Sequence, residues 1–249
     1  MKLRDKVAVV TGAGSGNGRA IAMEFAKEGA KVVIINRTRE NGDETLMKIK
    51  DMKGEGISLE ADVSNSKEFK EAIDKALEYY GRIDIMVNNA GIFDGQDYET
   101  TDEETFEKII NVNLKGVFLG TKFVLDNMLK NQKGVIINIA SVAGIRGGLG
   151  SPAYTASKHG IIGLTGDAAT NYGKDGVRSI AICPGMIETS MTKDILEDPS
   201  EETQQLIDSI PLQRTGKPED IGKLAVFLAS DDSSYINGTP IVIDGGLVT

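Results

Sequence analysis

Tyr154 and Lys158 lie four residues apart at the start of a segment that continues to Tyr172 with helical spacing of its apolar residues. Side chains at positions i and i+4 share one face of a helix, so the phenol and the ammonium are predicted neighbours. A phenol with a pKa near 10 is a poor base at neutral pH, and a nearby ammonium favours the phenolate. Lowering the pKa of Tyr154 by about three units requires about 4 kcal/mol of differential stabilisation. With that shift, Tyr154 can exchange a proton with an alcohol or a carbonyl group.

This spacing is common, and a core aromatic residue beside a surface lysine also has it, so neighbouring polar residues decide its meaning. Ser141 directly follows the apolar run Val135–Ala140, at the C-terminal end of a predicted strand. Ligands bind at that edge of a doubly wound sheet, where the hydroxyl could polarise a substrate oxygen, although a serine there is also a common turn or helix cap. Asn113 lies inside the predicted helical stretch Phe106–Leu129, where a polar residue of modest helix propensity needs a reason.

These residues depend on short apolar runs that alternate with longer stretches of helical period. The runs are Val7–Val10, Val32–Ile35, Ile57–Leu59, Ile83–Val87, Val135–Ile139, Val177–Ile182 and Ile241–Ile243. Most are continuous rather than alternating in polarity, as in strands buried on both faces of a parallel sheet. The alternation of strands and helices predicts an α/β fold of Rossmann type, a doubly wound parallel sheet of about seven strands with helices on both faces.

No Pro/Ser-rich linker, low-complexity segment or repeat divides the chain, so residues 1–249 are predicted to form a single domain. The longest stretch without strand character, about Gly185–Gly216, is polar at Glu197–Gln205, and we expect it to form a substrate lid at about residues 187–213. Four signals mark helix starts: Asn65 with Glu68, Thr101 with Glu104, Asp198 before Pro199, and Pro218.

The first predicted strand ends in a turn with four glycines in seven residues, Gly12 to Gly18. Such a turn lets backbone N–H groups approach a phosphate, and the N-terminus of the following helix adds a partial positive charge. The spacing is GxxxGxG, because Asn17 stands where the GxGxxG fingerprint needs its third glycine, and no Gly-Lys-Ser/Thr closes a P-loop. The turn predicts a mononucleotide or dinucleotide site, against the alternative of a tight turn that binds nothing.

The end of the second predicted strand indicates which dinucleotide to expect. In NAD-binding folds, an acidic residue about 20 positions after the turn accepts from the ribose 2′-hydroxyl. Asn36 stands there instead, so no carboxylate repels a 2′-phosphate, and Arg37 and Arg39 could donate to one. We expect NADP, with NAD as the alternative if both arginines are merely solvated.

Composition limits the possible partners. Lys and Arg number 28 and Asp and Glu 37, and the net charge of −9 argues against nucleic acid, which binds to basic surfaces. The single cysteine, Cys183, excludes an intramolecular disulfide and fits a reducing compartment, and the single histidine, His159, excludes His-rich zinc sites. The chain shows no apolar run of about 18 residues and no secretory signal, so we expect a cytoplasmic protein without metal or membrane contact.

Together these motifs resemble the short-chain dehydrogenase/reductase family in its single-domain form. The resemblance spans the whole chain and rests on TGAGSGNG at 11–18, Asp62-Val63, NNAG at 88–91, Asn113, Ser141, YTASK at 154–158 and Pro184-Gly185. It implies a catalytic tetrad of Asn113, Ser141, Tyr154 and Lys158. Tyr154 would donate the proton in carbonyl reduction and accept it in alcohol oxidation, while Lys158 would lower its pKa and hold the nicotinamide ribose. Ser141 would orient the substrate oxygen, and Asn113 would keep open a water-linked proton path through Lys158.

The same resemblance implies a cofactor site. Its residues are Gly12, Ser15, Gly16, Asn17, Gly18, Asn36, Arg37, Asp62, Val63, Asn89, Ala90, Gly91, Tyr154, Lys158, Pro184, Gly185, Ile187 and Thr189. The three motif glycines would line the pyrophosphate, Asp62 and Val63 the adenine, and Ile187 and Thr189 the carboxamide. Family members usually form tetramers, so a homotetramer is expected.

Two positions depart from the family pattern. Asn17 replaces an apolar residue, and Ser15 replaces the basic residue that marks many NADP-dependent members. Neither change removes a motif glycine, so the cofactor site is still expected, and the preference for NADP rests on Asn36 and Arg37.

The resemblance implies an enzyme, an NAD(P)(H)-dependent oxidoreductase that transfers a hydride between nicotinamide and a ketone or secondary alcohol as its small-molecule substrate. A 3-oxoacyl-ACP reductase of fatty-acid synthesis is one alternative, although residues 150–153 lack the Gln and Asn that many of these carry near the tyrosine. A sugar or polyol dehydrogenase of the glucose type is another. A relative that binds nucleotide without turnover would typically lose Tyr154 or Lys158, and both are present.

Overall fold

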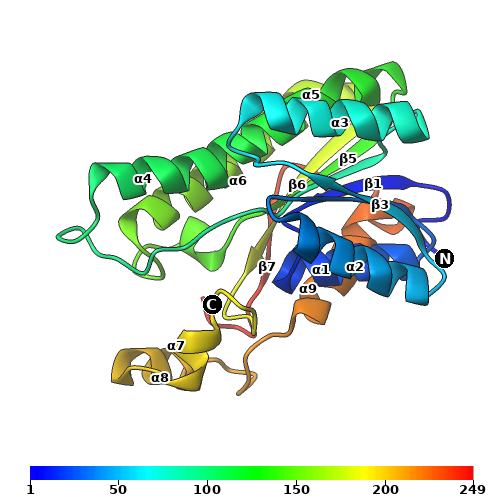
Figure 1. Cartoon of the computed structure of the whole chain (residues 1–249). Coiled ribbons are helices and arrows are strands. Elements are labelled where there is room, and N and C mark those ends of the chain that lie inside the picture. The colour runs from blue at the N-terminus through cyan, green and yellow to red at the C-terminus, as the bar shows by residue number, and fades with distance from the viewer. Residues whose placement is uncertain (249) are drawn as a thin grey trace.

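Seven strands form one parallel sheet in the computed structural model, which describes residues 1–248 (Figure 1). In chain order the strands are β1 Val7–Thr11, β2 Lys31–Asn36, β3 Glu55–Glu60, β4 Ile85–Asn88, β5 Gly134–Ile139, β6 Val177–Pro184 and β7 Pro240–Ile243. Their order across the sheet is β3-β2-β1-β4-β5-β6-β7, and every neighbouring pair is parallel. The predicted Rossmann-type fold and its seven predicted strands are confirmed.

Helices lie on both sides of the sheet, as predicted (Figure 1). One side carries α1 (Gly16–Lys27), α2 (Arg39–Asp51) and α9 (Pro218–Ala229), and the other carries α3 (Ser66–Tyr80), α4 (Glu103–Ile109), α5 (Gly116–Lys130) and α6 (Pro152–Tyr172). A π-helical turn, Ile110–Lys115, joins α4 to α5. Short 3-10 turns lie at Val142–Gly144, Gly173–Asp175 and Asp231–Ser233.

Alternate residues of a strand pack into different hydrophobic clusters on the two faces of the sheet. In β1, Ala8 and Val10 pack in one cluster with Phe25 of α1, whereas Val9 packs in another with Phe69 of α3. All five side chains are buried. Burial on both faces of the sheet explains why the strand sequences are continuously apolar.

Two of the predicted helix starts are confirmed. Asn65 caps α3, because its Oδ1 accepts from the backbone N–H of Glu68 (3.3 Å) while its amide donates to the Glu68 carboxylate (2.6 Å). Pro218 is the first residue of α9, a position where its missing N–H breaks no helical hydrogen bond.

The other two starts lie one or two residues further along the chain. Asp102 rather than Thr101 caps α4, because the carboxylate of Asp102 accepts from a first-turn N–H (2.7 Å) while the Thr101 hydroxyl donates to a preceding carbonyl. Ser200 rather than Asp198 caps α8 (Glu201–Asp208), with its hydroxyl accepting a backbone N–H (3.2 Å). Asp198 precedes a proline, which keeps it out of the helical region, and it ends α7 (Lys193–Glu197) instead.

The chain between β6 and α9 leaves the sheet. It carries α7 and α8, which project away from the rest of the molecule near the C-terminus (Figure 1). A parallel bridge between Ile187 and Gly216 joins the two ends of this excursion. Among the helices of residues 1–248, none combines the length and apolarity that a membrane crossing requires.

Candidate active site

A cavity of about 370 Å³ lies at the C-terminal edge of the sheet, where the strand order reverses between β1 and β4. Ligands bind at such a switch point in doubly wound folds. The ends of β1 to β6 all contribute lining residues. Every residue predicted for the cofactor site except Gly18 lines this cavity, and so does Ser141.

Helix α6 carries Tyr154 and Lys158, as the spacing predicts. Lys158 Nζ lies 5.3 Å from the centroid of the Tyr154 ring and donates to the carbonyl of Ile139 at the end of β5 (2.8 Å). Ser141 follows β5, and its Oγ accepts from the backbone N–H of Ala143 (3.1 Å). Ser141 therefore caps a 3-10 turn and also lines the cavity, and its role toward a substrate oxygen stays a prediction.

Burial controls the protonation of the Tyr-Lys pair. Burial raises the pKa of the Tyr154 phenol, and the Ser141 hydroxyl acts in the opposite direction. Burial also lowers the pKa of Lys158 to about 8, against a smaller effect of Cys183. The expectation that Lys158 lowers the pKa of Tyr154 is not met, because loss of solvent dominates at both groups and Nζ is bound to the Ile139 carbonyl.

The π-helical turn Ile110–Lys115 holds Asn113 behind the cavity wall, fully buried. Its Oδ1 accepts from the N–H of Ile92 (2.8 Å), and its Nδ2 donates to the carbonyl of the same residue (3.0 Å). A Cβ atom built on Gly91 would lie 3.4 Å from Asn113 Oδ1 and 3.7 Å from Lys158 Nζ, so all three residues meet there. These contacts supply the reason for a polar residue inside this helical stretch, and π-turns are frequent at functional sites. The water-linked path through Asn113 stays a prediction.

Positions 12 and 16 of the glycine-rich turn need glycine for their backbone conformation, and positions 12 and 18 need it for space. Gly12 and Gly16 have φ values of 63° and 51°, in the left-handed region, and a Cβ on Gly12 would lie 2.8 Å from the Cα of Ala90. Gly18 does not line the cavity. A Cβ there would collide with the backbone of Gly12 and the amide of Asn89, so Gly18 lets α1 pack closely against these loops.

The two departures from the family pattern both face the cavity. Asn17 Oδ1 is shielded from solvent and has no hydrogen-bond partner within residues 1–248. Ser15 precedes α1, but in the described part of the chain its side chain makes no capping hydrogen bond. The cavity therefore meets first-turn N–H groups that no side chain caps, whereas the unmatched acceptor of Asn17 is buried rather than open to it.

Thr11, the first residue of the TGAGSGNG motif but not a predicted site residue, positions the NNAG loop. Its Oγ1 accepts from the backbone N–H groups of Asn89 (3.0 Å) and Ala90 (3.1 Å), and Asn89 Nδ2 donates to the Thr11 carbonyl (2.9 Å). Asn88 turns instead to β5, where its amide donates to Asn138 (2.8 Å). The sequence signal for this role is a threonine, with its hydroxyl, as the last residue of β1.

The end of β2 lines the cavity with Asn36 and Arg37. Asn36 Oδ1 accepts from the N–H of Gly14 (3.2 Å), and its Nδ2 donates to the carbonyl of Thr38 (2.7 Å). Arg37 is exposed, whereas Arg39 pairs with a surface carboxylate of its own helix (3.5 Å) and does not line the cavity. Arg37 is thus the arginine of the predicted pair that faces the site.

The end of β6 and the chain after it form another wall of the cavity, and its lining residues include the predicted Pro184, Gly185, Ile187 and Thr189. Thr192 braces this segment, because its Oγ1 donates to the Ile187 carbonyl (2.5 Å) and accepts from the Thr189 N–H (3.0 Å). The wall is therefore held by local hydrogen bonds.

Several lining residues were not identified from the sequence: Ile35, Thr38, Asn41, Ala61, Ile92, Val112, Ile139, Ala140, Ser190, Met191 and Thr192. Those at strand ends follow from the rule for doubly wound sheets, but Asn41 and Val112 depend on how helices pack.

His159 is exposed, and burial raises the pKa of Cys183 to about 11, so neither resembles a reactive group. Among the side chains that the structure describes, no three of His, Cys, Asp or Glu are grouped to hold a metal ion.

Comparison with known proteins agrees with this geometry. A family model described as Enoyl-(Acyl carrier protein) reductase matches residues 12–248. The chain is 42% identical to the 3-oxoacyl-[acyl-carrier-protein] reductase FabG of Thermotoga maritima over 248 residues, 100% of both chains. It is 38% identical to the levodione reductase of Leifsonia aquatica over 253 residues, 98% of this chain and 95% of the relative.

A solved structure gives the same result. A Beutenbergia cavernae protein, described as an NAD(P)-dependent gluconate 5-dehydrogenase with NADP bound at low occupancy, superimposes with a TM-score of 0.94 at 35% identity. The match covers 99% of this chain and 98% of that one. With the motifs, the fold and full-length relatives in agreement, the chain belongs to the short-chain dehydrogenase/reductase family.

Proposed function

We propose that this protein is an NADP(H)-dependent oxidoreductase that transfers a hydride between nicotinamide and a ketone or secondary alcohol. One observation carries the proposal: the glycine-rich turn lines the same cavity as Ser141, Tyr154 and Lys158. A phosphate-binding turn and a proton-exchanging pair are the two parts that such a reaction needs from a protein. The relatives support the reaction class, since two of them are named reductases.

The residues of the cavity fit a dinucleotide. Gly12 and Gly16 leave the backbone open beside the uncapped N-terminus of α1, which suits a pyrophosphate. The predicted set would hold the cofactor, with Gly18 contributing through packing alone. When bound, the nicotinamide supplies or accepts the hydride.

Tyr154 exchanges the proton in this proposal. Its raised pKa keeps the phenol protonated at neutral pH, which is the form that donates to a carbonyl oxygen in reduction. Ser141 orients the same oxygen. Lys158, with a pKa of about 8, holds the nicotinamide ribose and passes protons onward along the path that Asn113 keeps open.

NADP is the proposed cofactor, with NAD as the alternative. Asn36 presents no carboxylate to repel a 2′-phosphate, and the exposed Arg37 lines the cavity beside it. The presence of NADP in the Beutenbergia cavernae relative supports this choice.

Two substrate classes are candidates. The similarity to FabG favours reduction of a 3-oxoacyl group, and the gluconate 5-dehydrogenase relative favours a sugar or polyol. Residues 187–213 would act as the lid over either substrate, because Thr189 and Met191 of this segment line the cavity. A nucleotide-binding relative without turnover is disfavoured by the complete Ser-Tyr-Lys set.

The proposed assembly is a cytoplasmic homotetramer that handles a small molecule, with no nucleic-acid or membrane partner. Phe106 and Phe118 expose 41% and 48% of their surface on α4 and α5, which supports a subunit interface there. Light scattering on the purified protein measures the subunit number, and a monomer would contradict the assembly.

Fluorescence titration with NADPH and NADH tests the cofactor, and Tyr154→Phe tests the reaction. We expect tighter binding of NADPH, and a loss of about 10²- to 10⁴-fold in kcat for the variant. The variant should bind the cofactor as the wild type does. Tighter binding of NADH would contradict the choice of NADP, and unchanged turnover would remove Tyr154 from the mechanism.

A further inference from the structure

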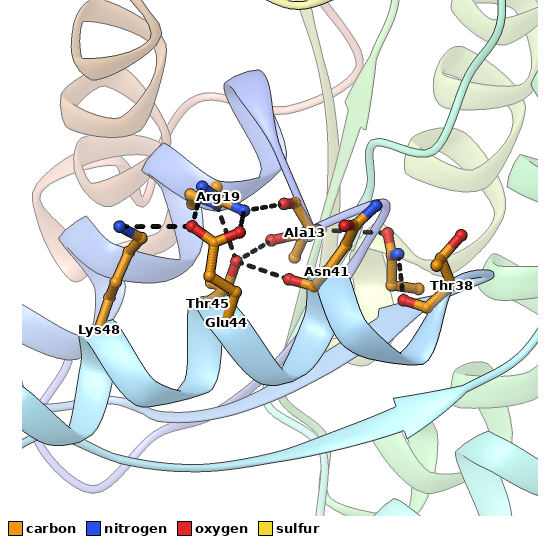
Figure 2. Close-up of polar contacts among 9 residues, drawn as sticks. Ala13, Arg19, Thr38, Asn41, Glu44, Thr45 and Lys48 are labelled. Carbon is orange, nitrogen blue, oxygen red and sulfur yellow. Dashed lines mark hydrogen bonds and ion pairs between the residues drawn. The ribbon is translucent and has the colours of Figure 1, made fainter.

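Helix α2 is fastened to the glycine-rich turn by polar contacts that the proposed reaction does not use (Figure 2). Arg19 of α1 donates to both carboxylate oxygens of Glu44 (2.9 and 2.8 Å) and, through Nε, to Thr45 Oγ1 (3.0 Å). Its Nη2 also donates to the carbonyl of Gly14. Thr45 Oγ1 in turn donates to the carbonyl of Ala13 (2.9 Å). We call Arg19, Glu44 and Thr45 the α2 latch, since it connects α2 to two successive carbonyls of the turn.

The α2 latch has the features of a contact that fixes geometry. A guanidinium that binds a carboxylate through two nitrogens sets orientation as well as charge. The hydrogen bonds and charge of Arg19 lower the pKa of Glu44, and Thr45 is fully buried. Lys48 also approaches Glu44 (3.4 Å), but within residues 1–248 its ammonium has no contact with the glycine-rich turn. Arg19 and Lys48 are both cations beside Glu44, but of the two it is Arg19 that also contacts the glycine-rich turn.

The packing of α2 against the glycine-rich turn also determines which amide side chains near Arg37 can still bind a ligand. Both ends of the Asn36 amide are engaged, by the Gly14 N–H and the Thr38 carbonyl. Asn41, on the first turn of α2, lies against the glycine-rich turn, and a Cβ on Gly14 would lie 2.7 Å from the Asn41 Cβ. Asn41 is exposed and lines the cavity, and its amide has no hydrogen-bond partner among the described residues. Asn41 thus adds an unengaged amide beside Asn36, whose Nδ2 already donates one of its two N–H groups to Thr38.

We infer that Asn41 is a specificity-determining residue for the ribose 2′ substituent of the cofactor, and that the α2 latch is a positioning device that holds Asn41 in place. The inference rests on the proposed binding of a dinucleotide. A 2′-phosphate offers three strong acceptor oxygens, which an amide N–H₂ at the N-terminal turn of a helix can satisfy. A ribose 2′-hydroxyl presents no such charge. Loosening α2 from the glycine-rich turn therefore weakens binding of NADPH more than binding of NADH.

Fluorescence titration of NADPH and NADH against four variants tests the inference. Asn41→Ala removes the donor, Thr45→Val removes the hydroxyl of the latch at nearly constant volume, and Thr45→Ser restores that hydroxyl. Lys48→Ala is the matched control, since it removes a cation that pairs with Glu44 of the latch. We expect Asn41→Ala and Thr45→Val to reduce the ratio of the NADH Kd to the NADPH Kd by about 5- to 10-fold. Thr45→Ser and Lys48→Ala should keep the wild-type ratio.

Two outcomes would overturn the inference. One is an unchanged ratio in both Asn41→Ala and Thr45→Val. The other is an equal loss of affinity for both cofactors, which a merely structural role of the α2 latch would produce. The wild-type ratio by itself tests the proposed preference for NADP, and the change of that ratio tests Asn41 and the latch, so the two failures are distinguishable. Asn41 is exposed, so Asn41→Ala tests the site even if Thr45→Val fails to fold.

Discussion

The side chain of Asn113 hydrogen-bonds both backbone polar groups of Ile92, the residue that follows the NNAG motif. Ile92 lines the cavity, and the next residue, Phe93, packs edge-on against the ring of Tyr154, with 5.2 Å between ring centroids. One buried amide thus fixes the loop that covers one side of the proposed proton donor. The contact between Asn113 and Ile92 connects the π-helical turn to the site, although Asn113 itself does not line the cavity.

Replacing Asn113 by Leu should therefore affect stability and turnover together. The N–H and carbonyl of Ile92 lose their partner, which should cost about 1–3 kcal/mol in the free energy of unfolding measured with urea. We expect kcat to fall while the cofactor Kd changes little, because Thr11 still holds the main chain of Asn89 and Ala90. Asn65→Ala is the control, since loss of this distant helix cap should cost about 1 kcal/mol without changing kcat. An Asn113→Leu variant of normal turnover would contradict this role.

Removing the Ser141 hydroxyl should slow turnover and shift its pH dependence. We expect Ser141→Ala to lower kcat by about 10²-fold, as for loss of one donor at a reacting oxygen. The hydroxyl lowers the pKa of Tyr154, so its loss raises that pKa further. Oxidation of an alcohol needs the deprotonated phenol, and its rise in rate with pH should move to higher pH in the variant. A profile of kcat against pH measures this, and an unshifted profile would show that Ser141 does not act on the phenol.

Lys158 should make the protein more stable as the pH rises above about 8. Burial lowers its pKa from 10.5 to about 8, so between these values the unfolded chain binds more protons than the folded one. The free energy of unfolding then increases with pH across that window, by up to about 3 kcal/mol from this group. The increase is absent below pH 8, where the amine is protonated in both states.

Urea unfolding of the wild type and of Lys158→Met, at about pH 7 and about pH 10, isolates this contribution. Cys183, whose pKa burial raises to about 11, is present in both proteins and works in the opposite direction as the pH rises. A difference between the two proteins that is the same at both pH values would exclude a depressed lysine pKa.

A methyl group at Gly18 should weaken the fold and both cofactors alike. Its Cβ would meet the backbone of Gly12 and the amide of Asn89, and forced repacking of this kind costs about 1–3 kcal/mol. We expect Gly18→Ala to lose that much stability and to bind NADPH and NADH with proportional losses, unlike the α2 latch variants. In Gly147→Ala the added Cβ meets no atom within 4 Å, so a change within about 0.5 kcal/mol is expected. Normal stability of Gly18→Ala would show that α1 can shift away from the loops.

The fold could be predicted because burial on both faces of the sheet leaves continuous apolar strands, and these are legible in the sequence. The helix starts at Asp102 and Ser200 were displaced from their predicted positions because several capping side chains stand next to one another. Which of them caps depends on the path by which the chain enters the helix.

The candidate site was predicted wherever it lies at strand ends, because topology alone brings those ends together. Asn41 was missed because it reaches the cavity through the packing of α2 against Gly14, which no spacing rule contains. The direction of the pKa shift at Tyr154 was missed for a related reason. Spacing shows that Lys158 is near, whereas the depth of burial, which controls both groups, is a property of the folded molecule.

The π-helical turn Ile110–Lys115 makes the molecule more sensitive to a deletion of one residue in this turn than to most substitutions there. A π-turn holds one residue more than an α-helical turn, so the residues inside it are shifted from the positions that an α-helix would give them. Loss of one codon within this turn would let it close as ordinary α-helix and move these residues to α-helical positions. Asn113 would then lose its register with Ile92, although every remaining residue of the site would be unchanged. Genes for this protein should therefore tolerate many substitutions in this turn and no single-residue gap.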